Sequence, residues 1–200
     1  MSTIPLDLET EVVVLPPPSL PAAATLEQAL KGRHSSRALR SEALPLPLLS
    51  ALLWSAFGVN RPDAGGRTAP SAHNWQEIDV YAVLPEGTYR YDAPGHRLLL
   101  ASAQDLRPHT GTQDFVAQAP LNLLYVVDFE RMSGARPDER EFLIGADAAC
   151  IAQNVYLFCA VAGLGTVARA LIDRRRLAMA LGLPPTQRIA LAQSVGYEQG

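Results

Sequence analysis

Two guanidinium groups, one imidazole and two hydroxyl groups stand together in residues 33–37, which read RHSSR. A guanidinium group can donate two parallel hydrogen bonds to phosphate oxygens, and neighbouring hydroxyl groups add further donors. Such a segment can hold a phosphorylated ligand without a glycine-rich loop. A solvated basic connector would have the same composition, so the spacing alone leaves both interpretations open.

A second candidate segment covers residues 67–76, which read RTAPSAHNWQ. Its small and amide-bearing side chains could hydrogen-bond a planar heterocycle. A turn-rich loop without a ligand is the alternative interpretation. Gln113, in the polar stretch before the apolar run at 121–127, is a weaker amide candidate.

Three polar residues interrupt the longest apolar stretch of the chain: Asp147, Gln153 and Asn154. Buried polar groups need hydrogen-bond partners. We therefore expect these side chains to form hydrogen bonds between helices at a buried interface. A catalytic carboxylate is the alternative for Asp147.

Other kinds of catalytic site lack their motifs. The four histidines are scattered, and no two of them lie three or four residues apart, as a histidine pair that binds a metal on a helix would. The GxSxG, GxxxxGK and GxGxxG patterns are missing, which argues against serine hydrolases, P-loop proteins and Rossmann folds. Cys150 and Cys159 show neither CxxC spacing nor a nearby histidine, so they are expected to be core residues.

Composition sets the outer limits of the interpretation. A chain of 200 residues with 48% hydrophobic and 18% charged residues fits one domain, and its apolar balance favours a subunit interface. The net charge of −3 gives no electrostatic attraction to nucleic acid or an anionic membrane, so neither partner is expected. No signal peptide is visible at the N-terminus, and we expect a cytoplasmic protein.

The elements that must position these residues follow from proline, glycine and hydrophobic patterns. Residues 1–24 are rich in proline and should form an extended arm, followed by a single domain over residues 25–200. Thr25 and Gln28 form a capping-box pattern for a helix over 26–31, and a second helix runs from residue 44 to Gly58. Residues 60–76 lack an apolar period and should form a long loop, which is often functional.

The rest of the chain divides into strands and two further helices. Strands are predicted at residues 78–84, 88–91 and 96–100 as a meander, at 121–127 as a central strand buried on both faces, and at 188–197. Helices are predicted at 139–162, apolar on nearly every side, and at 173–181.

Taken together and in this order, these segments resemble the nitroreductase family of FMN-dependent oxidoreductases. Residues 26–37 resemble the opening helix and phosphate motif of that family, and residues 70–76 resemble its PSxxNxQ loop. Gln153, Asn154 and the GLGT run at 163–166 resemble its central helix and exit. More narrowly, the PPP arm, the RTAPSA run at 67–72 and the GTYRYD run at 87–92 are similar to the branch that contains the azoline (thiazole/oxazole) dehydrogenases.

The resemblance implies an α+β fold with a mostly antiparallel central sheet flanked by helices, in an interlocked homodimer that binds FMN at its subunit interface. Arg33 would bind the phosphate, Ser35 a phosphate or ribityl oxygen, and Arg37 would approach N1 and O2 of the flavin ring. The Ser71–Asn74 segment would reach the same flavin from the other subunit. The cofactor-binding residues implied are Arg33, His34, Ser35, Arg37, Pro70, Ser71, Ala72, Asn74, Gln113, Ala168, Arg169 and Ala170.

The activity implied is ping-pong transfer of electrons from NADH or NADPH, through FMN, to an electron-poor small molecule such as a nitroaromatic or a quinone. Two alternatives stay open: a non-catalytic dimeric module that binds flavin or another ligand, and an enzyme like the azoline dehydrogenases. Relatives often end in Lys or Arg as further phosphate ligands, whereas this chain ends VGYEQG. Either Arg67 or Arg169 would substitute for them, or FMN binding would be weak.

Overall fold

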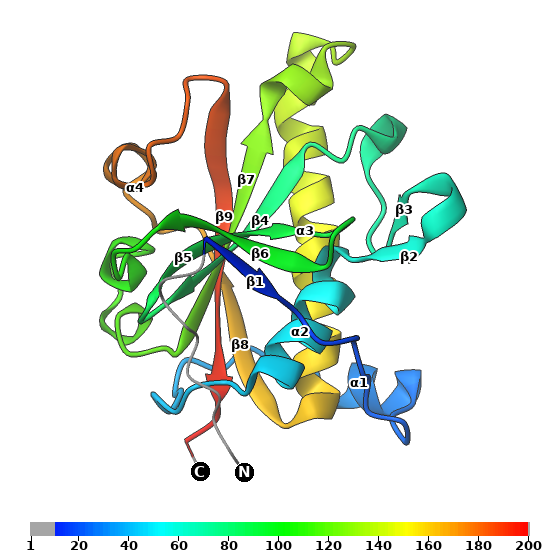
Figure 1. Cartoon of the computed structure of the whole chain (residues 1–200), viewed down its shortest axis with the longest axis vertical. Helices are drawn as coiled ribbons and strands as arrows, with labels where there is room; N and C mark the ends of the chain where they lie inside the picture. Colours follow the sequence, from blue (N-terminus) through cyan, green and yellow to red (C-terminus); the bar gives the residue numbers. More distant parts are fainter. Residues whose placement is uncertain (1–10, 200) are drawn as a thin grey trace.

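The computed structural model describes residues 11–199 and shows one antiparallel sheet packed against a long helix (Figure 1). The sheet has seven strands in the order β1-β6-β5-β4-β7-β9-β8, and each neighbouring pair is antiparallel. The strands are β1 (Val12–Val14), β4 (Ile78–Leu84), β5 (Gly87–Asp92), β6 (Arg97–Ser102), β7 (Leu121–Asp128), β8 (Leu164–Arg169) and β9 (Gln187–Tyr197). The α+β architecture expected from the sequence is confirmed.

Helices cover both faces of the sheet. α1 (Leu26–Gly32), α2 (Leu46–Phe57) and α3 (Pro137–Ala162) pack together on one face, and α4 (Arg174–Leu181) packs on the other. Alternate residues of the central strands divide between the two cores: Tyr125 faces α3, whereas Leu124 and Val126 face α4. Burial on both faces explains why β4 and β7 are continuously apolar rather than alternating.

Local sequence signals set the helix boundaries. Thr25 and Gln28 form the expected capping box at the start of α1. Gly58 caps α2, and the left-handed glycines Gly163 and Gly182 cap α3 and α4. α3 is long and apolar enough to cross a membrane by length and composition alone. Here its buried side chains belong to the core of the sheet.

Two expectations need correction. The residues after α2 are not a loop without regular structure: β2 (Val59–Arg61) and β3 (Gly66–Arg67) pair as a short hairpin, followed by a 3-10 turn at Ala72–Asn74. β8 follows α3 directly at Gly163 and was not predicted, because its pairing with β9 is a long-range contact that its sequence, LGTVAR, does not signal. In the N-terminal arm, β1 forms an edge strand beside β6, while residues 1–10 lie outside the described part.

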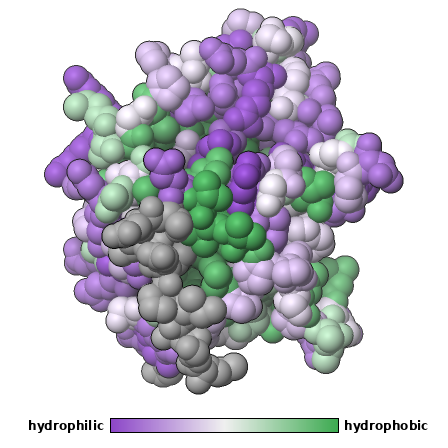
Figure 2. Space-filling view, viewed as in Figure 1, coloured by the Kyte–Doolittle hydropathy of each residue, from purple (hydrophilic) through white to green (hydrophobic). Residues whose placement is uncertain are grey.

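Apolar side chains reach the surface in two places. Figure 2 shows an apolar patch in the middle of the viewed face, where β1 and β6 lie in Figure 1; Val14 in β1 is 73% exposed. A second apolar region lies over α1, where Leu26 and Leu30 are 69% and 56% exposed. Both free cysteines lie within or against the core, as expected.

Candidate active site

The RHSSR segment leaves α1 and runs beside β8. Ser36 donates its backbone N–H to the carbonyl of Thr166 at 3.0 Å, which ties the segment to that strand. The guanidinium carbon of Arg33 lies 5.5 Å from the ring centre of Tyr156 in α3. The RHSSR segment is therefore held by the same edge of the sheet that carries the predicted cofactor-binding residues 168–170.

Tyr156 joins these two segments through a single atom. Its hydroxyl oxygen lies 2.9 Å from the Ser35 hydroxyl and accepts a hydrogen bond of 2.9 Å from the backbone N–H of Ala168. Sequence reasoning missed Tyr156 because a tyrosine within an apolar helix looks like a packing residue. Its role depends on contacts with Ser35 and with β8, which local sequence patterns do not show.

The basic side chains of the RHSSR segment differ in whether they contact a carboxylate. His34 contacts the Gly32 carbonyl and the Glu198 carboxylate, each at 2.8 Å; the backbone bond first, and then Glu198, raises the pKa of its imidazole. Within residues 11–199, neither Arg33 nor Arg37 forms an ion pair with a carboxylate. Arginine guanidinium groups and a serine hydroxyl on one short segment are the kinds of donor that bind a phosphate group.

The second candidate segment is folded tightly against β4 and α3. Ser71 accepts from the backbone N–H of Gln76 at 2.8 Å and donates to the Glu77 carboxyl at 3.0 Å. Ala72 donates its backbone N–H to Asp147 in α3 at 2.7 Å. The polar residue Asp147 thus has the partner expected of it, in a loop rather than in another helix.

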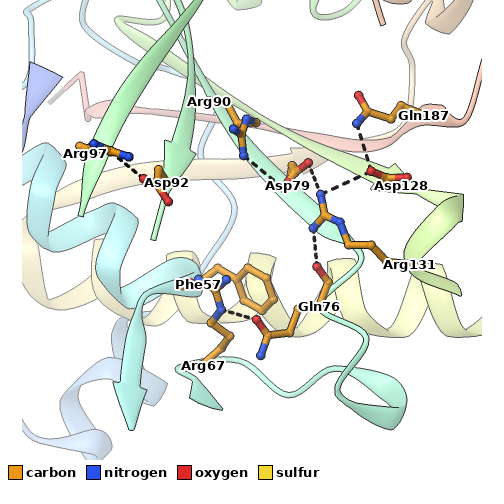
Figure 3. A network of polar contacts seen from close by, with 10 residues as sticks. All are labelled: Phe57, Arg67, Gln76, Asp79, Arg90, Asp92, Arg97, Asp128, Arg131 and Gln187. Carbon is orange, nitrogen blue, oxygen red and sulfur yellow. Dashed lines mark hydrogen bonds and ion pairs between the residues drawn. The ribbon is translucent and has the colours of Figure 1, made fainter. Parts of the chain in front are cut away.

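Gln76 is the centre of a polar network around this loop, drawn in Figure 3. Its side-chain oxygen accepts from Arg67 at 2.7 Å, and its backbone carbonyl accepts from Arg131 at 2.6 Å. Arg131 also ion-pairs with Asp79 of β4, and the guanidinium carbon of Arg67 lies 5.1 Å from the ring centre of Phe57. Burial lowers the pKa of Arg67. Arg67 is therefore already engaged in holding the loop.

The loop also carries an unusual backbone conformation. His73, Asn74 and Gln76 have φ values of 51°, 54° and 50°, in the left-handed region that residues other than glycine rarely adopt. Such conformations persist only where surrounding contacts impose them, and they concentrate at functional sites.

The two candidate segments contact opposite sides of α3. Asp147 and Tyr156 are nine residues apart, which is two and a half turns of an α-helix and about 13 Å along its axis. Within residues 11–199, no hydrogen bond or ion pair joins residues 33–37 to residues 70–76. The single chain therefore presents two separate half-sites.

Arg169 and Gln113 lie away from the Arg33 half-site contacts. The Arg169 side chain is 5% exposed and donates to the Thr110 carbonyl at 2.9 Å and the Asn122 amide oxygen at 2.8 Å. Burial lowers the pKa of its guanidinium to about 10. Gln113 is half-buried in the same loop as Thr110. In the 168–170 segment, Ala168 bonds Tyr156 and the Ala170 carbonyl accepts from Arg174 at 3.2 Å.

The other predicted residues are exposed or make few contacts. Pro70 is exposed at the entry to the loop, and Asn74 is exposed and accepts from the Gln76 side chain at 3.0 Å. Gln153 is exposed on α3, and the Asn154 amide lies 3.5 Å from the Ala56 carbonyl. Among the described residues, no cluster of three or more metal-ligating side chains is present.

The antiparallel sheet and the helices on its two faces define an α+β fold, and comparisons with known proteins identify the family of oxidoreductases to which it belongs. The sequence profile described as Nitroreductase family matches residues 30–197. A protein of Methanocaldococcus jannaschii that carries the name of a nitroreductase is 31% identical over 160 residues, which are 71% of this chain and 76% of the relative. The chain belongs to the nitroreductase family.

Solved structures share the fold. The crystal structure of a protein from Ralstonia eutropha JMP134, described as a nitroreductase, has a TM-score of 0.91 and 44% identity, covering 96% of this chain and 91% of the other. The NADPH:FMN oxidoreductase of Vibrio harveyi in complex with NAD+ has a TM-score of 0.63 and 17% identity, covering 88% of this chain and 69% of that one. At that identity the second likeness concerns the fold alone.

Proposed function

We propose that this chain is an FMN-dependent NAD(P)H oxidoreductase that transfers electrons to an electron-poor small molecule such as a nitroaromatic or a quinone. One observation carries the proposal. Arg33, Ser35 and the Ala168 backbone, which the family resemblance assigns to one flavin, converge on the Tyr156 side chain. The match of the Nitroreductase family profile to residues 30–197 supports an oxidoreductase of this kind.

The residues of the first half-site would bind the phosphate end of FMN. Arg33 supplies a guanidinium fork that no carboxylate occupies among residues 11–199, and Ser35 supplies a hydroxyl held by Tyr156. Arg37 is exposed on the same segment and would place a positive charge beside the flavin ring, where it favours the reduced, more negative state. His34 is engaged by Glu198, so its role is to fix the segment.

The second half-site would complete the cofactor site across a homodimer. The Ser71–Asn74 segment lies on the opposite side of α3 from Tyr156, so we infer that it serves the flavin bound by the partner subunit. The exposed Asn74 amide would contact the ring, while Ser71 and Ala72 hold the backbone. Gln113, Pro70 and the residues 168–170 would line the site around it.

FMN, when bound, supplies the hydride and electron acceptor chemistry of the reaction. The side chains of this chain bind and orient the cofactor and set its charge environment, rather than acting as a general acid or base. The open positions at Arg37 and Asn74 leave room for NADH or NADPH and the acceptor to occupy the site in turn. We propose that the enzyme works in the cytoplasm.

The absorption spectrum of the purified protein tests the proposal. Bands of oxidised flavin, bleached by NADH or NADPH under anaerobic conditions and restored by a nitroaromatic or quinone, are the expected result. A colourless protein that cannot be reconstituted with FMN would instead indicate a non-catalytic ligand-binding module. A thiazoline-containing peptide belongs in the substrate panel, because the sequence also resembles the azoline dehydrogenase branch.

A further inference from the structure

The carboxyl groups of Glu77 and Asp147 form a buried pair between the start of β4 and the middle of α3. Glu77 is 0% exposed and Asp147 is 7% exposed, and the two carboxyl groups bind neighbouring residues of one loop: Glu77 accepts from the Ser71 hydroxyl and Asp147 accepts from the Ala72 N–H. Two buried carboxylates on one loop would repel each other, so the arrangement favours a proton on one of them. Among residues 11–199, no Lys, Arg or His forms an ion pair with either group.

The contacts place the proton on Glu77. Asp147 accepts the backbone N–H of Ala72 at 2.7 Å, so its contact with the loop uses the carboxyl group as an acceptor. Glu77 accepts from Ser71 through Oε2, and its other oxygen, Oε1, is buried without a partner. A proton on Oε1 removes the negative charge from that unpartnered oxygen. Burial first, and then the charge of Asp147, raises the pKa of Glu77 to about 7.

The other charged groups around the pair are engaged elsewhere. Arg67 and Arg131 donate to the side-chain oxygen and the carbonyl of Gln76, and Arg131 pairs with Asp79 on β4. On α3, the guanidinium carbon of Arg140 lies 5.7 Å from a phenylalanine ring centre. On the loop, His73 is exposed and its ring lies against Trp75. A second negative charge on the pair would therefore have no cation to offset it.

The pair holds the start of a strained loop. Ser71 accepts from the Gln76 N–H and donates to Glu77, and Ala72 donates to Asp147. The two acids therefore bind two neighbouring residues of the segment. The next residues, His73 and Asn74, are the ones with left-handed backbone. Each such residue raises the free energy of the fold, so their conformation depends on these contacts.

We infer that Glu77 and Asp147 act as a proton-sharing pair that positions the Ser71–Asn74 segment for its ligand, and that loss of the shared proton to solvent loosens the segment. The two buried carboxylates would then repel each other and release Ser71 and Ala72. Glu77 and Asp147 are positioning residues, since they reach the ligand only through the loop. The inference rests on the proposed function for the identity of that ligand, FMN.

The dissociation constant of FMN, measured by quenching of flavin fluorescence from about pH 5 to about pH 9, tests the role of the pair. In the wild type, affinity should fall about tenfold as the pH rises through 7. In Glu77→Gln, the amide can donate to Asp147 and accept from Ser71 without titrating, so this fall should disappear. The FMN phosphate itself ionises near pH 6, but it does so in both proteins, so the ratio of the two affinities isolates the pair. Glu141→Gln, an exposed acid on the same helix, should follow the wild type.

The NMR shift of the Ala72 amide proton tests the pair without flavin. In the wild type it should titrate with a midpoint near 7, and in Glu77→Gln it should not. A titrating Ala72 resonance in a chain that binds no FMN would confirm the shared proton but remove its ligand role together with the proposed function. An Ala72 resonance that does not titrate, or equal pH dependence of FMN affinity in wild type and Glu77→Gln, would overturn the inference.

Discussion

The hydroxyl of Ser35 and the backbone N–H of Ala168 lie 2.9 Å from the same atom, the hydroxyl oxygen of Tyr156. Ser35 follows α1 and Ala168 lies in the last-but-one strand of the chain, so α3 brings together two segments that are far apart in sequence. Since Tyr156 can donate only one hydrogen and accepts the one from Ala168, it is free to donate to Ser35. The side chain thereby fixes both segments.

Removing that hydroxyl should loosen both segments. In Tyr156→Phe, Ala168 loses its acceptor, and we expect a loss of about 1 kcal/mol in the free energy of unfolding together with weaker FMN binding. Chemical denaturation and flavin titration measure the two effects. Tyr81→Phe is the matched control, because Tyr81 is buried on the α4 side of the sheet and its hydroxyl makes no hydrogen bond within residues 11–199. Equal FMN affinity in Tyr156→Phe and the wild type would place the cofactor elsewhere.

Arg33 should contribute most to retention of the cofactor. Arg33→Ala removes a charge-assisted contact with a phosphate group, worth about 1.5–3 kcal/mol, which corresponds to an increase of about 10- to 150-fold in the FMN dissociation constant. Fluorescence quenching measures it. Arg40→Ala, in the same connector but paired with Glu42, should bind FMN as the wild type does. If Arg33→Ala binds equally well, Arg33 does not contact the phosphate.

Arg37 should influence the redox potential more than the affinity. Arg37→Gln keeps hydrogen-bonding capacity but removes the positive charge, so the midpoint potential of the bound flavin should fall as the reduced state loses its partner. A spectroelectrochemical titration measures the potential. An unchanged potential would show that another residue supplies the positive charge near the ring.

The acidity of Glu77 predicts how stability depends on pH. In the unfolded chain this carboxyl group loses its proton near its ordinary pKa of 4.5, whereas in the fold it keeps the proton up to about 7. Between these values the folded state binds more protons, so the free energy of unfolding should decrease as the pH rises from 4.5 through 7, by up to about 3 kcal/mol. Urea denaturation across this range should show the decrease in the wild type and not in Glu77→Gln. A stability that rises over this range in the wild type alone would contradict the assignment.

Local patterns in the sequence were enough for most of the fold. The apolar runs that became β4 and β7, and the glycines that end α3 and α4, are short-range signals, and the structure follows them. β8 could not be predicted, because its first residues continue the apolar helix and its strand character comes only from pairing with β9.

Some residues of the candidate site could likewise be found from the sequence, and others could not. Arg33 and Ser71 stand out by composition, whereas Tyr156 and Glu77 act through contacts with residues far away in sequence. The protonated state of Glu77 depends on burial beside Asp147, and no spacing rule links a residue at the start of a strand to one in the middle of a helix. Long-range contacts of this kind appear only once the chain is folded.

The two half-sites on opposite sides of α3 predict that each flavin site needs two chains. A homodimer of Arg33→Ala, and one of the double variant Ser71→Ala/Asn74→Ala, should each have two damaged sites. Refolding equal amounts together should give heterodimers with one intact and one doubly damaged site, which restores about a quarter of the wild-type activity if pairing is random. Turnover of NADH or NADPH with a nitroaromatic measures the recovery in the refolded mixture, and heterodimers isolated through tags on each variant should have about half of the wild-type activity.

The control for this experiment places all three substitutions in one chain and refolds it with the wild type. If each site uses both subunits, each of the two sites in the heterodimer of the triple variant and the wild type carries substitutions from one subunit. That heterodimer should therefore be less active than the heterodimer of Arg33→Ala with Ser71→Ala/Asn74→Ala, which keeps one intact site. If instead residues 33–37 and 71–74 serve a flavin within one chain, the heterodimer of the triple variant and the wild type keeps one intact site, and the heterodimer of the two separate variants has none. The order of the two activities therefore decides whether the half-sites meet across the subunit interface.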